Sequence, residues 1–155
     1  MPVLVYRDLA ELPRQPHALT IGNFDGVHRG HQHLFGRLRA RAAERAVRSL
    51  VLTFDPLPAE VLRPQEAPPR LCTLDERLAL IGACQIDSVL VLRFDQEFAR
   101  QAPEEFIEQL VHYAAPVELV IGDDFRFGHG RSGSVTTLRE LGSQYGFDVT
   151  VVPRV

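Results

Sequence analysis

GNFDGVHRGH, residues 22–31, is the stretch that decides the fold of this chain. It follows the apolar run at 18–21 and precedes a helical pattern, so it joins a strand to a helix. Such a junction presents unpaired backbone N–H groups and the positive end of a helix dipole to one point, which suits a phosphate. His28 and His31 are about one helical turn apart and can face the same anion. Two imidazoles aimed at a phosphate predict phosphoryl or nucleotidyl transfer.

Strands and helices alternate along the sequence. Near-continuous apolar runs, of the kind buried on both faces of a parallel sheet, predict strands at 18–21, 49–54, 88–92, 117–121 and 148–152, after a short opening strand at 3–6. We therefore expect a single α/β domain over residues 1–155. Its sheet should be Rossmann-like, doubly wound, mainly parallel and five-stranded, with helices on both faces.

The helices are marked by their apolar faces and their caps. In the first helix, one face should be buried and the arginine-bearing face solvated; these are Leu34, Phe35, Leu38 and Ala42 against Arg37, Arg41 and Arg45. Three further helices are predicted from a Thr73–Glu76 capping box with Gly82 at the end, from Pro103 in a first turn, and from a Ser134 cap with Gly146 at the end.

Composition excludes several functions. The net charge of -3 provides no basic field for nucleic acid. No apolar stretch is long enough to span a membrane and no signal-peptide pattern is visible, so we expect a cytoplasmic protein without a membrane partner. All 17 basic residues are arginines, which excludes a P-loop lysine and Schiff-base catalysis. Cys72 and Cys84 lack the spacing of a zinc site and should be free thiols.

Each polar, glycine-rich segment follows a predicted strand, at 22–31, 54–58 and 122–133. Because ligands of doubly wound sheets bind at the carboxyl ends of the strands, these three loops should converge. The histidine pair could instead bind a metal, although the local spacing fixes no third ligand. Gly22, Gly26 and Gly30 are expected to allow a positive φ or a close approach of ligand. For Asn23 and Asp25, turn chemistry is as good an explanation as binding.

Three motifs carry a resemblance to a known family. GNFDGVHRGH is similar to the strand–loop–helix motif of the HxGH nucleotidyltransferase superfamily, and more narrowly to the adenylyltransferase module of bacterial bifunctional riboflavin kinase/FAD synthetases. LTFDPLPAEVLRP at 52–64 resembles that family's second signature, and IGDDFRFGHGRSG at 121–133 its third. The similarity in element order covers nearly the whole chain.

The resemblance implies transfer of AMP from ATP to FMN, giving FAD and pyrophosphate, with Mg²⁺ accompanying ATP. By this resemblance His28 and His31 are catalytic, and the residues expected to bind ATP are Gly22, Asn23, Phe24, Asp25 and Gly30. Those expected to bind FMN are Phe54, Asp55, Pro56, Asp124, Phe125, Arg126, Phe127 and Arg131. No residue is predicted to ligate a metal, and a riboflavin kinase domain is expected in the same full-length protein.

Alternatives remain open in the second and third loops. The five prolines between 55 and 70 fit a binding loop or a plain surface excursion. Many family members have histidine where this chain has Leu57, so any role of that side chain is lost or moved. Phe125 and Phe127 could flank a flavin or pin the loop from the core, and Asp124 could contact ligand or pair with a neighbouring arginine.

The resemblance also implies elements beyond residue 155. Family members continue into an ISSTxxR segment that contacts the ATP phosphates and then into the kinase barrel, whereas these 155 residues end at Val155. We therefore expect this stretch alone to fold, to bind nucleotide weakly and to turn over poorly. Two other functions remain: a related nucleotidyltransferase acting on phosphopantetheine or nicotinamide mononucleotide, and a non-catalytic nucleotide-binding module.

Overall fold

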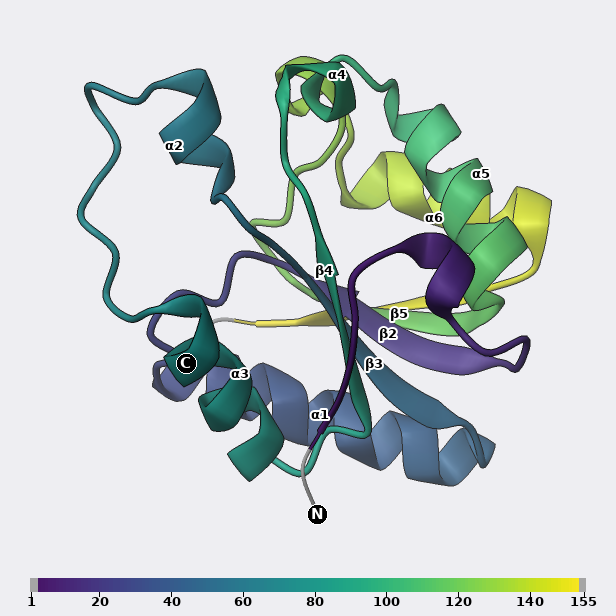
Figure 1. Ribbon diagram of the computed structural model, residues 1–155. Coiled ribbons are helices and arrows are strands. Elements are labelled where there is room, and N and C mark those ends of the chain that lie inside the picture. Colours follow the sequence, from purple (N-terminus) through teal and green to yellow (C-terminus); the bar gives the residue numbers. More distant parts are fainter. Residues whose placement is uncertain (1–2, 154–155) are drawn as a thin grey trace.

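The computed structural model describes residues 3–153, which form one six-stranded parallel sheet with helices on both faces (Figure 1). The strands are β1 (Leu4–Tyr6), β2 (His17–Ile21), β3 (Arg48–Phe54), β4 (Ser88–Leu92), β5 (Pro116–Gly122) and β6 (Asp148–Val152). The helices are α1 (Arg29–Arg45), α2 (Pro58–Leu62), α3 (Leu74–Ala83), α4 (Gln96–Ala99), α5 (Pro103–Ala114) and α6 (Val135–Tyr145). Short 3-10 turns occur at Leu9–Glu11 and His129–Arg131.

The strand order is β1-β4-β3-β2-β5-β6, and every pairing is parallel. This confirms the doubly wound α/β fold. The expectation of five strands was one short, because the opening strand joins the sheet as an edge strand beside β4. The chain leaves β2 toward β3 on one side and returns to β5 on the other. The switch point therefore lies at the carboxyl ends of β2 and β5, where ligands bind in such sheets.

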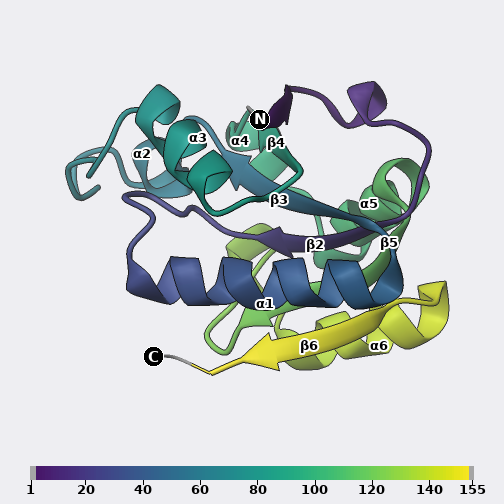
Figure 2. The same ribbon diagram turned by 90° about the horizontal axis from the view of Figure 1, so that it is seen from below.

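The two faces of the sheet carry separate apolar cores. Alternate side chains of one strand point to opposite faces, so Ala18 packs with α1 and α3 while Leu19 and Ile21 pack with α5 and α6. The predicted apolar face of α1 is confirmed, because Leu34, Phe35, Leu38 and Ala42 are its buried residues. Figure 2 shows α1 lying along the sheet, which fixes the direction of its N-terminus.

The predicted helix caps are largely confirmed. Thr73 and Glu76 form the capping box of α3, Pro103 begins α5, and Ser134 and Gly146 flank α6. Gly82 does not end α3, because the helix continues through Ala83 and the chain turns only at Gln85, where φ is 63°. No helix in residues 3–153 combines the length and the apolar character needed to cross a membrane.

The predicted arginine face of α1 is open to solvent, since Arg37 and Arg45 are exposed and Arg41 is half-buried, but two of these arginines also pair with the sheet. Arg41 donates to both carboxylate oxygens of Glu118 on β5, at 2.7 and 2.8 Å, and Arg45 adds a longer contact of 3.2 Å. Glu118 is completely buried and also accepts a hydrogen bond from Thr150 on β6. A carboxylate below the helix therefore draws these arginines inward and fastens α1 to the sheet.

Candidate functional site

The first loop, residues 22–28, leads from the end of β2 to the start of α1. His28 occupies the N-cap position of α1, but it makes no side-chain hydrogen bond to the first turn. Within the described chain, the N–H groups of that turn are therefore not capped by a side chain at this position. The helix N-terminus points at the switch point of the sheet and can take an anion there.

The two predicted catalytic histidines lie together. Their rings are stacked, with centroids 3.6 Å apart and planes inclined by 23°. The edge of the Phe24 ring packs against His31 at a centroid distance of 5.1 Å. Gly30 allows this arrangement, because a Cβ atom there would lie only 3.3 Å from Cε1 of His28. The structure thus brings both imidazoles to one side of the helix start.

Packing holds the first loop in an unusual backbone conformation. Phe24 and Val27 have positive φ values of 54° and 43°, which cost free energy in residues with a Cβ. Both side chains are buried in the core, and this burial offsets the cost. Of the three glycines predicted to need freedom, Gly26 has a positive φ of 84°, whereas Gly22 gives room to the Phe24 ring.

The remaining residues predicted to bind ATP have structural roles in the first loop. Asp25 accepts hydrogen bonds from the backbone N–H groups of Leu71, at 2.9 Å, and Cys72, at 3.2 Å. The side chain of Asn23 is exposed, and its backbone carbonyl accepts a hydrogen bond from the hydroxyl of Thr53. Asp25 thus ties the first loop to the segment that enters α3.

The electrostatics of His31 follow from its surroundings. Burial lowers the pKa of His31 to about 4, and the neighbouring His28 acts in the same direction. Asp25 and Asp124 oppose this shift. The ring nitrogen Nδ1 is buried and has no hydrogen-bond partner in the part of the chain described. His31 is therefore neutral at neutral pH and lacks the partner that would fix its tautomer.

This pKa predicts a pH dependence of stability. The unfolded chain takes up a proton on His31 near pH 6.5 and the folded chain only near pH 4, so the free energy of unfolding should fall as pH drops between these values. A full shift of this size corresponds to about 3 kcal/mol, and solvent access to the ring should reduce it to on the order of 1–2 kcal/mol. Urea unfolding of wild type and His31→Gln at pH 7 and pH 4.5 measures it.

His33→Gln is the matched control, since this exposed histidine lies on the same helix. The wild-type curve also contains a contribution from His17, whose pKa burial lowers as well. The difference between the two variants isolates His31. Equal pH dependence in both would show that His31 titrates normally in the folded protein.

The proline-rich loop, residues 55–70, contains α2, which the sequence did not predict. Arg70 closes this loop by donating to Asp55 at 2.7 Å and to both oxygens of Glu60. These contacts raise the pKa of Arg70. Leu57 is buried at the start of α2, so the position of the family histidine faces inward in this chain. Figure 1 shows the following segment swinging away from the sheet before it reaches α3.

The predicted FMN-binding residues of the second signature divide between core and surface. Phe54 is buried and packs edge-on against Phe94 and Phe98. Asp55 and Pro56 line an open hollow of about 490 Å³ at the carboxyl ends of β3 and β4, together with Val61, Phe94 and Arg93. A hollow of this size falls within the range of small-molecule sites.

The third loop, residues 123–134, approaches the first. The charge of Asp124 acts to raise the pKa of His31, so the two loops lie within electrostatic range of each other. Phe125 and Phe127 stack with centroids 5.3 Å apart, and Phe127 is buried against Phe106. This matches the interpretation in which the two rings pin the loop. Arg126 and Arg131 are exposed.

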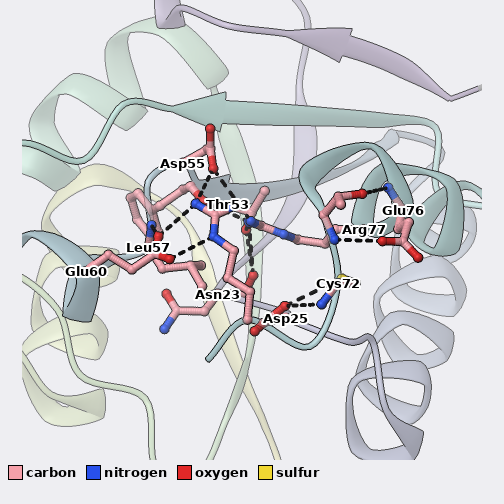
Figure 3. A network of polar contacts seen from close by, with 12 residues as sticks. Asn23, Asp25, Thr53, Asp55, Leu57, Glu60, Cys72, Glu76 and Arg77 are labelled. Atoms are coloured by element: carbon pink, nitrogen blue, oxygen red, sulfur yellow. Dashed lines mark hydrogen bonds and ion pairs between the residues drawn. The ribbon is translucent and has the colours of Figure 1, made fainter. Parts of the chain in front are cut away.

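Sequence reasoning missed the residue that joins the first loop to the proline-rich loop. Arg77 of α3 is completely buried between them and donates to the carbonyl of Phe54 at 2.7 Å and to Thr53 at 2.9 Å (Figure 3). The signal was present, since position 77 falls on the same helical stripe as Leu74, Leu78 and Ile81.

The fold and these loops together define a doubly wound α/β domain in which the N-terminus of α1 and two histidines lie at the switch point of the sheet. The described residues contain no group of three or more histidines, cysteines and carboxylates placed to hold a metal ion. The histidine pair and the backbone N–H groups at the start of α1 are of a kind that suits a phosphorylated ligand.

Comparison with known proteins identifies the family. The sequence profile described as FAD synthetase matches residues 11–155. The bifunctional riboflavin kinase/FMN adenylyltransferase of Escherichia coli K12 is 42% identical over 144 residues, which are 92% of this chain and 46% of that protein. The protein of the same name from Pseudomonas fluorescens is 42% identical over 88% of this chain and 44% of its own. The chain belongs to the FAD synthetase family and spans about half the length of these relatives.

A solved structure confirms the fold. The crystal structure described as a macrolide-efflux protein from Streptococcus pneumoniae superposes with a TM-score of 0.81. It is 21% identical in sequence, and the match covers 99% of this chain and 50% of that one. At this identity the likeness shows the architecture of the domain alone.

Proposed function

We propose that the chain is an FMN adenylyltransferase module that makes FAD and pyrophosphate from FMN and ATP. A phosphate oxygen of FMN attacks the α-phosphorus of ATP, a new P–O bond forms, and the bond to the β-phosphate breaks as pyrophosphate leaves. The observation that carries the proposal is the stacked pair of His28 and His31 at the N-terminus of α1, in a chain of the FAD synthetase family. The names of its relatives lead us to expect a riboflavin kinase domain in the same polypeptide.

The first loop would supply the triphosphate half of the site. Negative charge builds up on the pyrophosphate as the bond to the α-phosphorus breaks, and the helix N-terminus and the two imidazoles offset it. His31 is neutral before substrate binds, and an incoming phosphate raises its pKa and favours the protonated form. The residues act by positioning and electrostatics, because the phosphate of FMN is itself the nucleophile.

Mg²⁺ would enter with ATP. Protein sites usually hold this ion through one or two carboxylates together with the substrate phosphates. Asp25 is engaged by backbone N–H groups of Leu71 and Cys72, so the substrate phosphates would hold the ion. The ion would neutralise charge on the triphosphate.

The flavin half would lie between the proline-rich loop and the third loop. Asp55 and Pro56 contribute from the first of these, and Arg126 and Arg131 are exposed on the second. Phe54 and Phe127 support this half from below, since both are buried. An exposed guanidinium suits the FMN phosphate and can also stack on a flat ring.

An acceptor assay tests the proposed function. The full gene product is incubated with ATP, Mg²⁺ and, in separate reactions, FMN, nicotinamide mononucleotide or phosphopantetheine, and the adenylylated product and pyrophosphate are quantified. We expect FAD from FMN and little product from the other two. Preferred use of another acceptor contradicts the flavin assignment, and binding of FMN without any FAD indicates a non-catalytic module.

Substitution in the third loop tests where FMN binds. Arg131→Ala and Asp124→Ala are each expected to weaken FMN binding about tenfold, which corresponds to ~1.4 kcal/mol. Fluorescence quenching of FMN measures the affinity. Arg48→Ala is the matched control, because it removes an exposed arginine at the opposite end of the sheet. Unchanged FMN affinity in both third-loop variants would move the flavin phosphate elsewhere.

A further inference from the structure

Among the described residues, Arg77 has the largest side chain that is completely buried. Burying a guanidinium is costly unless hydrogen bonds and an opposite charge compensate for the lost water. Its ion-pair partner is Asp55, but Nη2 of Arg77 and Oδ1 of Asp55 are 4.0 Å apart, too far for a hydrogen bond. Burial accordingly lowers the pKa of Arg77. The charge is held mainly by neutral acceptors.

Those acceptors belong to the ends of two neighbouring strands. Nη1 donates to the carbonyl of Phe54, the last residue of β3, at 2.7 Å and to Oγ1 of Thr53 at 2.9 Å. It makes a longer contact of 3.4 Å with the carbonyl of Asn23, the second residue after β2. Thr53 also donates to that carbonyl, at 2.8 Å (Figure 3). One guanidinium nitrogen thus joins the first loop to the start of the proline-rich loop.

The rest of the guanidinium is not satisfied in this way. Nε and Nη2 are buried, and the described residues offer them no hydrogen-bond partner. An apolar side chain of similar volume would fill the space without leaving two donors unpaired, and such exchanges are often neutral or stabilising. Packing alone therefore does not account for an arginine here. Its distinctive property is a charged donor, Nη1, that reaches the backbone carbonyls of two loops at once.

Asp55 lies between two arginines. Arg70 holds its Oδ1 at 2.7 Å, while Arg77 approaches the same atom from the buried side. A displacement of Oδ1 by about 1 Å toward Arg77 would complete a hydrogen bond to Nη2. Asp55 of the proline-rich loop can thus move into contact with Arg77 while Arg77 keeps its hydrogen bonds to Phe54 and Thr53.

We propose that Arg77 is a positioning residue that sets the distance between the first loop and the proline-rich loop. This inference rests on the proposed function, in which those loops carry ATP and FMN. The reacting phosphates must meet in line, and a misplacement of about 1 Å can lower a rate by on the order of 100-fold. Arg77 touches neither substrate and acts through the backbone of Asn23 and Phe54.

Steady-state kinetics of the full gene product test the proposal. For Arg77→Met we expect kcat to fall by about 10- to 100-fold, while the KM values for ATP and FMN each change by less than about threefold. Arg77→Lys keeps a charge and a donor but not the guanidinium geometry, so its kcat should lie between those of wild type and Arg77→Met. Thr53→Val removes the hydroxyl link to Asn23 and should lower kcat several-fold in a protein of nearly the same shape.

Glu118→Gln is the control for lost stability. It removes a buried charge toward the amino end of β5, far along the sheet from the loops, and should leave kcat within about twofold of wild type. A folded Arg77→Met protein with wild-type kcat overturns the proposal. An equal loss of kcat in Glu118→Gln at equal melting temperature does so too, because the effect would then follow stability.

Hydrogen exchange gives a readout that needs no turnover. In Arg77→Met, or in Thr53→Val if the former does not fold, amide exchange should rise together in residues 23–27 and 55–62 and stay unchanged in 123–133. A rise confined to α3 overturns the proposal. FAD formation by the wild type tests the proposed function alone. Failure of the proposed function can therefore be told from failure of the positioning role of Arg77.

Discussion

Replacing His28 or His31 by alanine is expected to lower kcat for FAD formation by about 10² to 10³. The rings are stacked 3.6 Å apart at the N-terminus of α1, so each is placed to donate to a phosphate that the helix dipole also attracts. Losing one donor that acts on charge in the transition state costs roughly this much in other sites of the kind. The KM for FMN should change little, because the proposed FMN contacts lie in other loops.

The two variants should differ in stability. His31 packs against Phe24, so its truncation opens a space in the core and should lower the melting temperature, whereas His28 is exposed and its loss should not. His33→Ala is the matched control, since it removes an exposed histidine from the same helix and should leave kcat unchanged. A His28→Ala enzyme that makes FAD at the wild-type rate would remove His28 from the mechanism.

The helices and strands that carry a periodic or continuous apolar pattern could be predicted from the sequence. The face of α1 formed by Leu34, Phe35, Leu38 and Ala42 was predicted residue by residue, because an amphipathic helix on a sheet leaves a 3.6-residue period. The long strands were visible as apolar runs for a similar reason. The edge strand β1 has three residues and two exposed side chains, so it carried too little pattern to enter the strand count.

Buried charges escaped prediction because their partners come from distant segments. Glu118 interrupts an apolar strand, and Arg41 and Arg45 lie four residues apart on α1. Arg41 and Glu118 are 77 residues apart in the sequence, and nothing in the sequence shows that they meet. The partners of Arg77 escaped prediction for the same reason, since its acceptors lie on β3 and in the first loop. Local pattern predicts which face is apolar, whereas the pairing of a charge depends on the tertiary fold.

The two histidines of the candidate site could be predicted from the sequence, whereas the hydrogen bonds that hold its loops could not. The spacing of His28 and His31 predicted that both rings lie on one side of the helix start, whereas their stacking is seen only in the structure. The contacts of Asp25 with Leu71 and Cys72 join segments 46 residues apart and leave no local signature. The loops therefore reveal the chemistry, and long-range hydrogen bonds decide their geometry.

Glu118→Gln is expected to lower the free energy of unfolding by about 2–3 kcal/mol at pH 7. The carboxylate is completely buried and accepts hydrogen bonds from Arg41, Arg45 and Thr150. Glutamine keeps the shape but turns an N–H group toward arginine donors, so at least one charge-assisted hydrogen bond is lost without replacement. Urea unfolding followed by circular dichroism measures the change.

Glu44→Gln is the matched control, because Glu44 also pairs with Arg41, at 2.6 Å, but its side chain is 62% exposed. Exposed pairs contribute little, so this variant should stay within about 0.5 kcal/mol of wild type. Equal losses in the two variants would show that burial does not strengthen the Glu118 cluster.

The difference in the free energy of unfolding between wild type and Glu118→Gln should depend on pH if it is electrostatic in origin. Burial acts to raise the pKa of Glu118, but the hydrogen bonds from Arg41 and Thr150 outweigh it and hold that pKa below its usual value. The contribution of a carboxylate with a lowered pKa is complete above its unfolded pKa and is lost as pH falls through the folded one. The gap between wild type and Glu118→Gln should therefore narrow in acid. A gap that stayed constant down to the acid transition would mean that Glu118 fastens α1 to β5 by its shape and not by its charge.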